Sequence, residues 1–359
     1  MEYGARTGAY GIAVRSVAER WLRELSDGSE DFVCSPAGLW LALGAVAAGA
    51  RQETAGELRA LLGVAEPEAA EAVTSAARAL AETDALAVAT GVWSQVPVYR
   101  AYREALPGIG FGAIDAHAID AWVRERTEGL VERLPVPLQP GTLLALVNVL
   151  ALKARWAQPF EPHRTRDSDF TDASGVRHRV PTMHRNTLPG EVWRVGGATV
   201  VELRCRNQGA RVRFVLGEAG AAPVDVLPAA WADGGLRTPL DAEDVVVALP
   251  RFSVRTAIDV TPQLPALGVH RATTAQADFS GLSPERLAIS VVAQEAVVEV
   301  AELGVEAAAA TVVLMQPGGA PPRPRRIERV AFDRPFGFAV LDGTGDVPLF
   351  AGWQAQAPR

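Results

Sequence analysis

The sequence predicts an α+β fold, with helices in the first part of the chain and β-strands in the rest. Apolar residues recur at helical spacing up to about residue 134, and strand-like patterns dominate from Trp156 to the C-terminus. Helices precede strands instead of alternating with them, which disfavours a doubly wound parallel sheet. The 359 residues are 48% hydrophobic, enough for a large buried core, and contain no internal repeat. We therefore expect a single domain over residues 1–359.

The helical patterns differ in how much of their surface is apolar. The segment after Pro36 is apolar on every side and too long for a strand, which predicts a buried helix. Thr54 and Glu57 have the spacing of a capping box at the start of another helix. The expected helices cover residues 14–25, 37–48, 66–82 and 119–134, with a further one starting near residue 54.

Three early segments predict strands. Residues 31–34 form a short strand that Pro36 halts, and residues 86–93 alternate between apolar and other side chains. Residues 143–152 are a continuous apolar run, which is typical of a strand buried on both faces.

Composition excludes several classes of protein. A net charge of -7 argues against a nucleic-acid binder. Two cysteines, Cys34 and Cys205, are too few for a disulfide scaffold, and Cys34 lies in an apolar run as a buried free thiol would. No apolar stretch is long enough to span a membrane. The N-terminus has no signal-peptide pattern, so a cytoplasmic location is expected, with secretion left open.

The most informative segment is residues 302–316, which combines a helix-like alanine run with β-branched residues. As a strand it would have one face without charge and one that carries Glu306. The glycine- and proline-rich residues 317–324 cannot continue a strand or a helix. The segment therefore predicts a loop with the pattern of a central strand and an exposed tip. The uncharged face comprises Val305, Ala307, Ala309, Thr311, Val313 and Met315.

This pattern resembles the reactive-centre hinge of the serpins, a family of serine protease inhibitors. The family hinge has an acidic residue, a variable residue, glycine, a small residue, glutamate and then a run of small residues. Here the corresponding residues are Glu302, Gly304, Val305, Glu306, Ala307, Ala308, Ala309 and Ala310.

Further segments are similar to serpin signatures in the same order, over roughly residues 14–355. The most specific surrounds Asn148 and Trp156, with Lys153 between them and Pro159-Phe160 after them. The others include Ser35-Pro36, Gly49-Ala50-Arg51, Trp122-Val123, Leu249-Pro250-Arg251-Phe252, Ala277-Asp278-Phe279-Ser280-Gly281 and Asp333-Arg334-Pro335-Phe336.

The resemblance implies a serpin fold with three β-sheets, whose large central sheet accepts a reactive-centre loop of about residues 302–332. It places Ser35, Asn148 and Gln294 in the shutter, a polar network that guards the opening of the sheet. It places Trp156, with the pair Arg251 and Glu302, at the breach, where insertion begins. Ordinary core packing would also account for Trp156 and Asn148.

Several positions depart from the family pattern. Val305 stands where Thr or Ser is usual, and Gln294 replaces a histidine, which removes any pH-sensitive behaviour of that side chain. Asp120 replaces an asparagine, and the loop is a few residues longer than usual.

The resemblance implies suicide inhibition: a serine protease cleaves the loop, and the hinge then inserts as a new strand while the acyl-enzyme is trapped. The family spacing from Glu302 places the reactive bond at Gly318-Gly319, which favours an elastase-like or subtilisin-like target. Bonds near Leu314 and Met315, or at Arg325-Arg326, are alternatives. We expect a monomer that needs no cofactor and no metal.

Two other functions compete with inhibition. A serpin fold without inhibition would serve as a chaperone or binding protein, and Val305 and the long loop leave that reading open. An enzyme is disfavoured because no nucleophile elbow, zinc-protease motif or phosphate-binding loop occurs. The five histidines show no metal-ligand spacing.

Overall fold

The computed structural model describes residues 2–81, 86–134, 136–152, 154–206, 209–304 and 326–358, with backbone alone for residues 2–8. Seven α-helices lie within these ranges, six of them before residue 130. They are α1 (Glu2–Leu25), α2 (Pro36–Ala47), α3 (Gln52–Leu62), α4 (Glu66–Ala81), α5 (Arg100–Glu104), α6 (Ala116–Arg126) and α7 (Pro223–Val226). Short 3-10 turns include η4 (Leu227–Trp231).

Three β-sheets contain the described strands. A five-stranded sheet has the order β12 (Phe252–Asp259), β13 (Val291–Val300), β4 (Leu144–Leu152), β2 (Leu86–Ser94) and β3 (Gly110–Ala113). A four-stranded sheet has the order β14 (Ile327–Ala331), β11 (Asp244–Pro250), β6 (Arg177–Thr187) and β5 (Arg166–Thr171). A seven-stranded sheet has the order β1 (Phe32–Cys34), β16 (Pro348–Gln354), β15 (Phe336–Asp342), β9 (Ala210–Leu216), β8 (Ala198–Arg204), β7 (Val192–Val195) and β10 (Thr238–Pro239).

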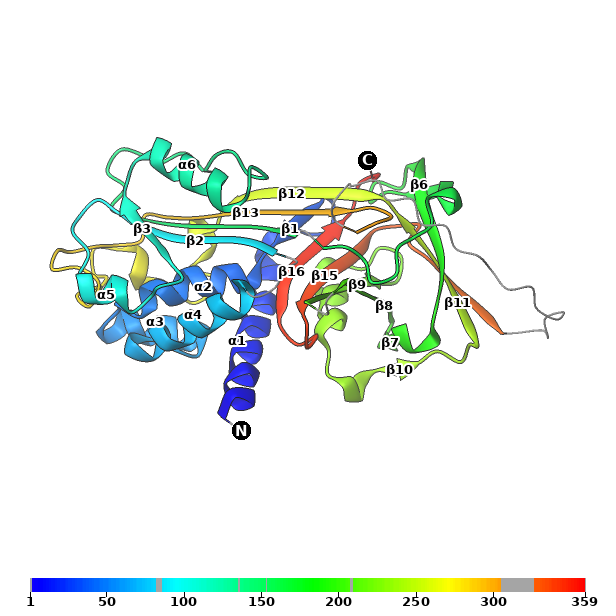
Figure 1. Ribbon diagram of the computed structural model, residues 1–359, viewed down its shortest axis with the longest axis horizontal. Helices are drawn as coiled ribbons and strands as arrows, with labels where there is room; N and C mark the ends of the chain where they lie inside the picture. Colours follow the sequence, from blue (N-terminus) through cyan, green and yellow to red (C-terminus); the bar gives the residue numbers. More distant parts are fainter. Residues whose placement is uncertain are drawn as a thin grey trace.

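The five-stranded sheet lies between two helical layers (Figure 1). Helices α2, α3 and α4 cover one face, and α6 lies across the other. Alternate residues of β4 follow this division: Leu146 and Leu150 belong to the main core on the α2 side, and Val147 and Val149 pack in a second cluster with α6. Both faces of β4 are therefore buried, as its continuous apolar run predicts.

Helix α2 is the most deeply buried helix, since all twelve of its residues are buried. Ser35 caps it by accepting a hydrogen bond from the backbone N–H of Gly38, and Pro36 occupies the first turn, where no amide hydrogen is needed. Gly38 leaves room for the sheet below, because a Cβ there would lie 1.9 Å from Oδ1 of Asn148. The start of α2 is thus pressed directly onto the centre of β4.

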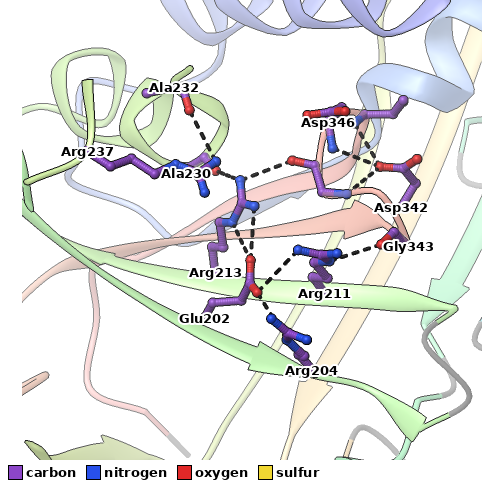
Figure 2. Close-up of polar contacts among 12 residues, drawn as sticks. Glu202, Arg204, Arg211, Arg213, Ala230, Ala232, Arg237, Asp342, Gly343 and Asp346 are labelled. Carbon is purple, nitrogen blue, oxygen red and sulfur yellow. Dashed lines mark hydrogen bonds and ion pairs between the residues drawn. The ribbon is translucent and has the colours of Figure 1, made fainter. Parts of the chain in front are cut away.

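A buried ion cluster ties together distant parts of the seven-stranded sheet (Figure 2). Arg213 on β9 is 1% exposed, and its Nε donates to Oε2 of Glu202 on β8 at 3.0 Å. Its Nη1 donates to the carbonyl oxygens of Ala230 at 2.6 Å and of Gly345 at 3.1 Å. Burial lowers the pKa of Arg213, but its carboxylate and carbonyl partners compensate the charge. Turn η4 and the β15–β16 hairpin are therefore anchored to one guanidinium.

Two sequence expectations about helices were wrong. Helix α6 ends at Arg126 and not at residue 134, because Glu128 and Gly129 adopt left-handed backbone angles (φ 52° and 83°) that stop a right-handed helix. Thr54 is not a cap: α3 begins after Arg51, and the Thr54 hydroxyl accepts from the backbone of Asp278 instead.

Candidate functional site

The residues expected at the site occupy two places on the five-stranded sheet. Ser35, Asn148 and Gln294 meet at its centre under α2, and Trp156, Arg251, Glu302 and Gly304 gather where β13 ends. The rest of the expected hinge and reactive bond lies outside the described residues: Val305, Glu306, Ala307, Ala308, Ala309, Ala310, Gly318 and Gly319.

At the centre of the sheet, Gln294 connects three structural elements. Its Oε1 accepts from the backbone N–H of Ser35 at 2.7 Å, and its Nε2 donates to the Ser35 carbonyl at 2.9 Å. The same Nε2 donates to Oδ1 of Asn148 at 3.1 Å, across the boundary between β13 and β4. Glutamine can make these contacts because its amide both donates and accepts. The amide is uncharged, which suits a site where Ser35, Asn148 and Gln294 are each 1% exposed or less.

Two further partners complete this network, and sequence reasoning missed both. Asn148 donates from Nδ2 to the hydroxyl of Thr90 on β2 at 2.8 Å. The Ser35 hydroxyl donates to the carbonyl of Leu349 on β16 at 2.6 Å. A polar residue among the alternating residues of β2 was the only available signal for Thr90, and a backbone carbonyl leaves no signal in a sequence. The network therefore spans β2, β4, β13, the start of α2 and the last strand of the chain.

At the end of β13, Trp156 holds the chain by its backbone and its ring. The indole is fully buried, and its Nε1 donates to the carbonyl of Ala301 at 2.8 Å. The backbone N–H of Trp156 donates to the carbonyl of Leu303 at 3.0 Å. The ring meets Phe214 of the seven-stranded sheet edge-on at a centroid distance of 6.4 Å. Trp156 is thus a core aromatic residue that also fixes the first residues after β13.

Glu302 is held as a buried carboxylate. Its side chain is 8% exposed, and Oε1 accepts from Nε of Arg251 at 2.7 Å and from the hydroxyl of Thr165 at 2.5 Å. Arg251 Nη2 contacts the same oxygen. Burial opposes ionisation, but the hydrogen bonds from Arg251 and Thr165 outweigh it, so the pKa of Glu302 lies below its ordinary value. The carboxylate therefore stays charged at neutral pH and fixes the start of the hinge.

Gly304 marks the point where the chain turns back. Its φ of +144° is a conformation that side chains rarely adopt, and a Cβ there would lie 2.1 Å from the carbonyl oxygen of Ala154. Ala301 and Gly304 pair with each other across the turn, and Gly304 also forms an antiparallel bridge with Arg155, three residues beyond the end of β4. At Gly304 the chain that leaves β13 therefore runs antiparallel to the residues that follow β4.

Strands β13 and β4 are direct neighbours, and they run parallel. Seven residue pairs join them, from Val291 opposite Ala145 to Val297 opposite Ala151. The other neighbours of these two strands, β12 and β2, are antiparallel to them. We call the boundary between β13 and β4 the seam. The expected hinge begins directly after β13, which belongs to the five-stranded sheet. This sheet is therefore the candidate for the sheet that accepts the loop, although the seven-stranded sheet has more strands.

Within the described ranges, no helix has both the length and the apolar character needed to cross a bilayer. Within those same ranges, no group of three or more His, Cys, Asp or Glu side chains is placed to hold a metal ion. Cys34 and Cys205 are both buried free thiols, as expected for Cys34.

Comparison with known proteins gives a consistent family assignment. The chain is 32% identical over 238 residues to alpha-1-antiproteinase 2 of Equus caballus, a match that covers 65% of this chain and 55% of that protein. It thus matches about half the length of that relative. It is 29% identical over 361 residues to Iripin-2 of Ixodes ricinus, with 93% of this chain and 90% of that protein covered.

Solved structures share the whole architecture. Serpin48 of the insect Tenebrio molitor superposes with a TM-score of 0.79 at 26% identity, covering 97% of this chain and 98% of that one. Human thyroxine-binding globulin superposes with a TM-score of 0.80 at 22% identity, covering 98% of this chain and 100% of that one, a likeness of fold alone. The family model described as serpin (serine protease inhibitor) matches residues 13–356. With its three sheets and this nearly complete match, the chain belongs to the serpin family.

Proposed function

We propose that the protein is a suicide inhibitor of a serine protease, which traps its target by inserting the cleaved hinge into the seam. The observation that carries this proposal is the parallel pairing of β13 and β4 next to a chain that has already reversed at Gly304. A strand that enters between two parallel neighbours, in the direction opposite to both, forms antiparallel ladders on each side. Antiparallel pairing is slightly more stable per residue than the parallel pairing it would replace.

The bridge between Gly304 and Arg155 supports a specific register for insertion. Continued along β4, the antiparallel pairing would bring Ala309 opposite Leu150 and Thr311 opposite Asn148. Residues directly opposite in a ladder share a face. The uncharged hinge face would therefore lie on the α2 side with Leu150, where β4 contributes to the main core. Thr311 would reach the polar Asn148 and Gln294, which separate when the seam opens.

The charged hinge residue suits the opposite face. Glu306 lies between residues of the uncharged face, so in a strand its side chain would point to the opposite, α6 side of the sheet. That side already holds a charge at the seam: Glu295 of β13 is 4% exposed and accepts a hydrogen bond from Nε of Arg255 at 2.6 Å. About twelve newly paired residues would contribute on the order of 10 kcal/mol, at roughly 1 kcal/mol per hydrogen bond. The uninserted fold would then persist because of a kinetic barrier.

Gly318-Gly319 is our proposed reactive bond. Glycine before the scissile bond suits proteases whose pocket accepts small residues, so an elastase-like or subtilisin-like enzyme is the proposed target. Cleavage at Arg325-Arg326 would lengthen the tether between protease and sheet, weaken distortion of the enzyme and yield a plain substrate.

The test is incubation of the purified protein with elastase, subtilisin, chymotrypsin and trypsin, followed by denaturing gels and mass spectrometry. The proposal expects a complex of the summed masses that survives denaturation, and a released C-terminal peptide starting at Gly319. Ala309→Glu should still be cleaved but form little complex, because insertion would bury an unpaired carboxylate beside Leu150. Cleavage of the unmodified protein by every protease without any complex would overturn the inhibitory proposal.

The second candidate is a non-inhibitory serpin that binds a ligand or a client protein. It is favoured by Val305, a bulkier residue than the hinge pattern usually has, and by the length of the loop. Thyroxine-binding globulin, which has this fold, is a binding protein by its name. A gain in thermal stability after loop cleavage would support insertion, whereas no gain would support this second candidate.

A further inference from the structure

A buried carboxylate on the α6 side of the five-stranded sheet has one oxygen without a protein partner. Glu295 of β13 is 4% exposed. Arg255 of β12 donates to it from Nε at 2.6 Å and contacts it through Nη2 at 2.5 Å, and both contacts reach Oε1. No hydrogen bond or ion pair from the described part of the chain reaches Oε2. Because a carboxylate accepts hydrogen bonds at both oxygens, Oε2 is open to a donor from outside the chain.

A cavity of about 480 Å³ lies beside this carboxylate, a volume within the range of small-molecule sites. Its lining comes from β12, β13 and the segment that follows α6, which are far apart in the sequence. The lining residues are Gly129, Leu130, Glu132, Arg133, Leu134, Arg255 and Glu295. Sequence reasoning therefore had no contiguous pattern from which to find this cavity.

Hydrogen bonds hold the wall after α6 in place before any ligand arrives. Oδ1 of Asp120 accepts from the backbone N–H of Leu134 at 2.6 Å. The Thr127 hydroxyl donates to the carbonyl of Val123 at 2.9 Å and accepts from the backbone N–H of Val131 at 3.1 Å. Val131 is also fully buried in the second core cluster. Binding in this cavity would therefore cost little ordering of the wall.

The charges of the lining are balanced, which disfavours a simple anion or a simple cation. Glu132 and Glu295 oppose Arg133 and Arg255. The side chains of Glu132 and Arg133 are exposed, and neither has an ion pair or a hydrogen bond with the described residues. The cavity thus offers free donors on arginine and free acceptors on glutamate. A ligand with one positive and one negative group would satisfy both with charge-assisted hydrogen bonds.

Two leucines give the cavity an apolar wall. Leu130 is 41% exposed, and Leu134 is half-buried. An aliphatic body that lies against them would remove from water apolar surface that the fold leaves accessible. The free carboxylate lies on the sheet, and the free guanidinium lies on the segment after α6. The two charges of a matching ligand should therefore stand at opposite ends of its aliphatic body.

We propose that this cavity binds a small zwitterion with an ammonium and a carboxylate at opposite ends of an aliphatic chain. The ammonium donates to Oε2 of Glu295, and the carboxylate pairs with Arg133, whose guanidinium can offer it two parallel hydrogen bonds. The chain packs against Leu130 and Leu134. This inference does not rest on the proposed inhibitory function.

The first test is titration of the intact protein with 6-aminohexanoate, followed by saturation-transfer NMR and calorimetry at low salt. Binding should saturate at one site. Hexanoate and hexylamine have the same chain but one charge each, and each should bind about tenfold more weakly. Equal binding of the three compounds, or no binding of 6-aminohexanoate at millimolar concentration, would overturn the proposal.

A substitution assigns the carboxylate end of the ligand. Arg133→Gln should weaken 6-aminohexanoate binding severalfold and leave hexylamine binding unchanged, because hexylamine has no carboxylate. Arg20→Gln is the matched control, since Arg20 is an exposed arginine of α1 and should not affect binding. An equal effect of the two substitutions would refute the assigned contact.

A larger side chain tests the place of binding. Leu130→Trp should fill the cavity from an exposed position, abolish binding and leave the far-UV circular dichroism unchanged. Retained binding in this variant would place the ligand elsewhere and refute the site. None of these readouts involves a protease. A failed complex assay would remove the proposed function and leave this site intact, and the reverse also holds.

Discussion

Replacing Gln294 by leucine tests whether the polar network at the centre of the five-stranded sheet stabilises this fold. Leucine has nearly the same volume but offers no hydrogen bond. The Ser35 carbonyl would still accept from the backbone of Leu39 at 3.0 Å. The Ser35 N–H and Oδ1 of Asn148 would be left without a partner in a buried place.

The cost follows from those two groups. Each buried group without a partner costs about 1–3 kcal/mol, so Gln294→Leu should destabilise the fold by about 4 kcal/mol. At about 2.1 cal/mol/K of unfolding entropy per residue, a chain of 359 residues loses roughly 1.3 °C in Tm for each kcal/mol. The expected fall in Tm is therefore about 5 °C.

The measurement is thermal unfolding at pH 7, followed by circular dichroism at one heating rate for the unmodified protein and two variants. Gln95→Leu is the matched control, since Gln95 is exposed and its side chain makes no hydrogen bond with the described residues. A fall in Tm below 1 °C for Gln294→Leu, or an equal fall for Gln95→Leu, would refute the reasoning. If the hinge inserts as proposed, the same variant should also convert faster to the inserted form on mild heating, because a bond across the seam is gone.

Three further changes follow from the geometry. Gly304→Ala should lower the free energy of unfolding by about 1–3 kcal/mol in a urea titration, because the φ of this residue is unfavourable for alanine and the added Cβ would meet the Ala154 carbonyl. Gly190→Ala is the control, since a Cβ there would have no atom within 4 Å. Arg251→Met should cost about 1 kcal/mol at pH 7. Because the pKa of Glu302 is lowered in the folded state, that difference should shrink as pH falls through this pKa, and a difference independent of pH would contradict it. Hydrogen bonds, above all the one from the Ser174 side chain, hold the pKa of Asp172 at about 2 in the folded protein. The carboxylate therefore stabilises the fold above about pH 4, and this stabilisation disappears towards pH 2. Asp172→Asn should flatten the acid-unfolding curve between these pH values.

The parts of the fold that the sequence predicts best are long, pure patterns. The apolar run of β4 and the all-apolar helix α2 were confirmed nearly to the residue, because burial on every side leaves few alternatives. The end of α6 was missed because the apolar residues Leu130, Val131 and Leu134 continue at helical spacing past Gly129, whereas the left-handed backbone angles of Glu128 and Gly129 stop the helix.

The site was predictable where a side chain has an unusual chemical role. Gln294 in an apolar strand and Gly304 beside Glu302 both stand out by residue type. The Arg155–Gly304 bridge and the Leu349 carbonyl could not be predicted, since backbone groups carry no residue identity. The roles of these residues in gating, and the reactive bond, remain predictions that the protease experiment addresses.

The place of β16 has a consequence for how the chain is made. This strand follows all the other described strands in the sequence, yet it lies between β1 and β15 and pairs Gly352 with Val33 of β1. Ser35 also donates its hydroxyl to Leu349 on that strand. Until residues 348–354 have been made and have left the ribosome, β1 lacks its neighbour in the sheet and the Ser35 hydroxyl lacks its acceptor.

Early helices can therefore form during synthesis, but the seven-stranded sheet cannot be completed until β16 has left the ribosome. A cell that expresses this protein must therefore protect an incomplete core until β16 has been made. Loss of the last dozen residues should then remove the folded state altogether and not just trim one edge of it.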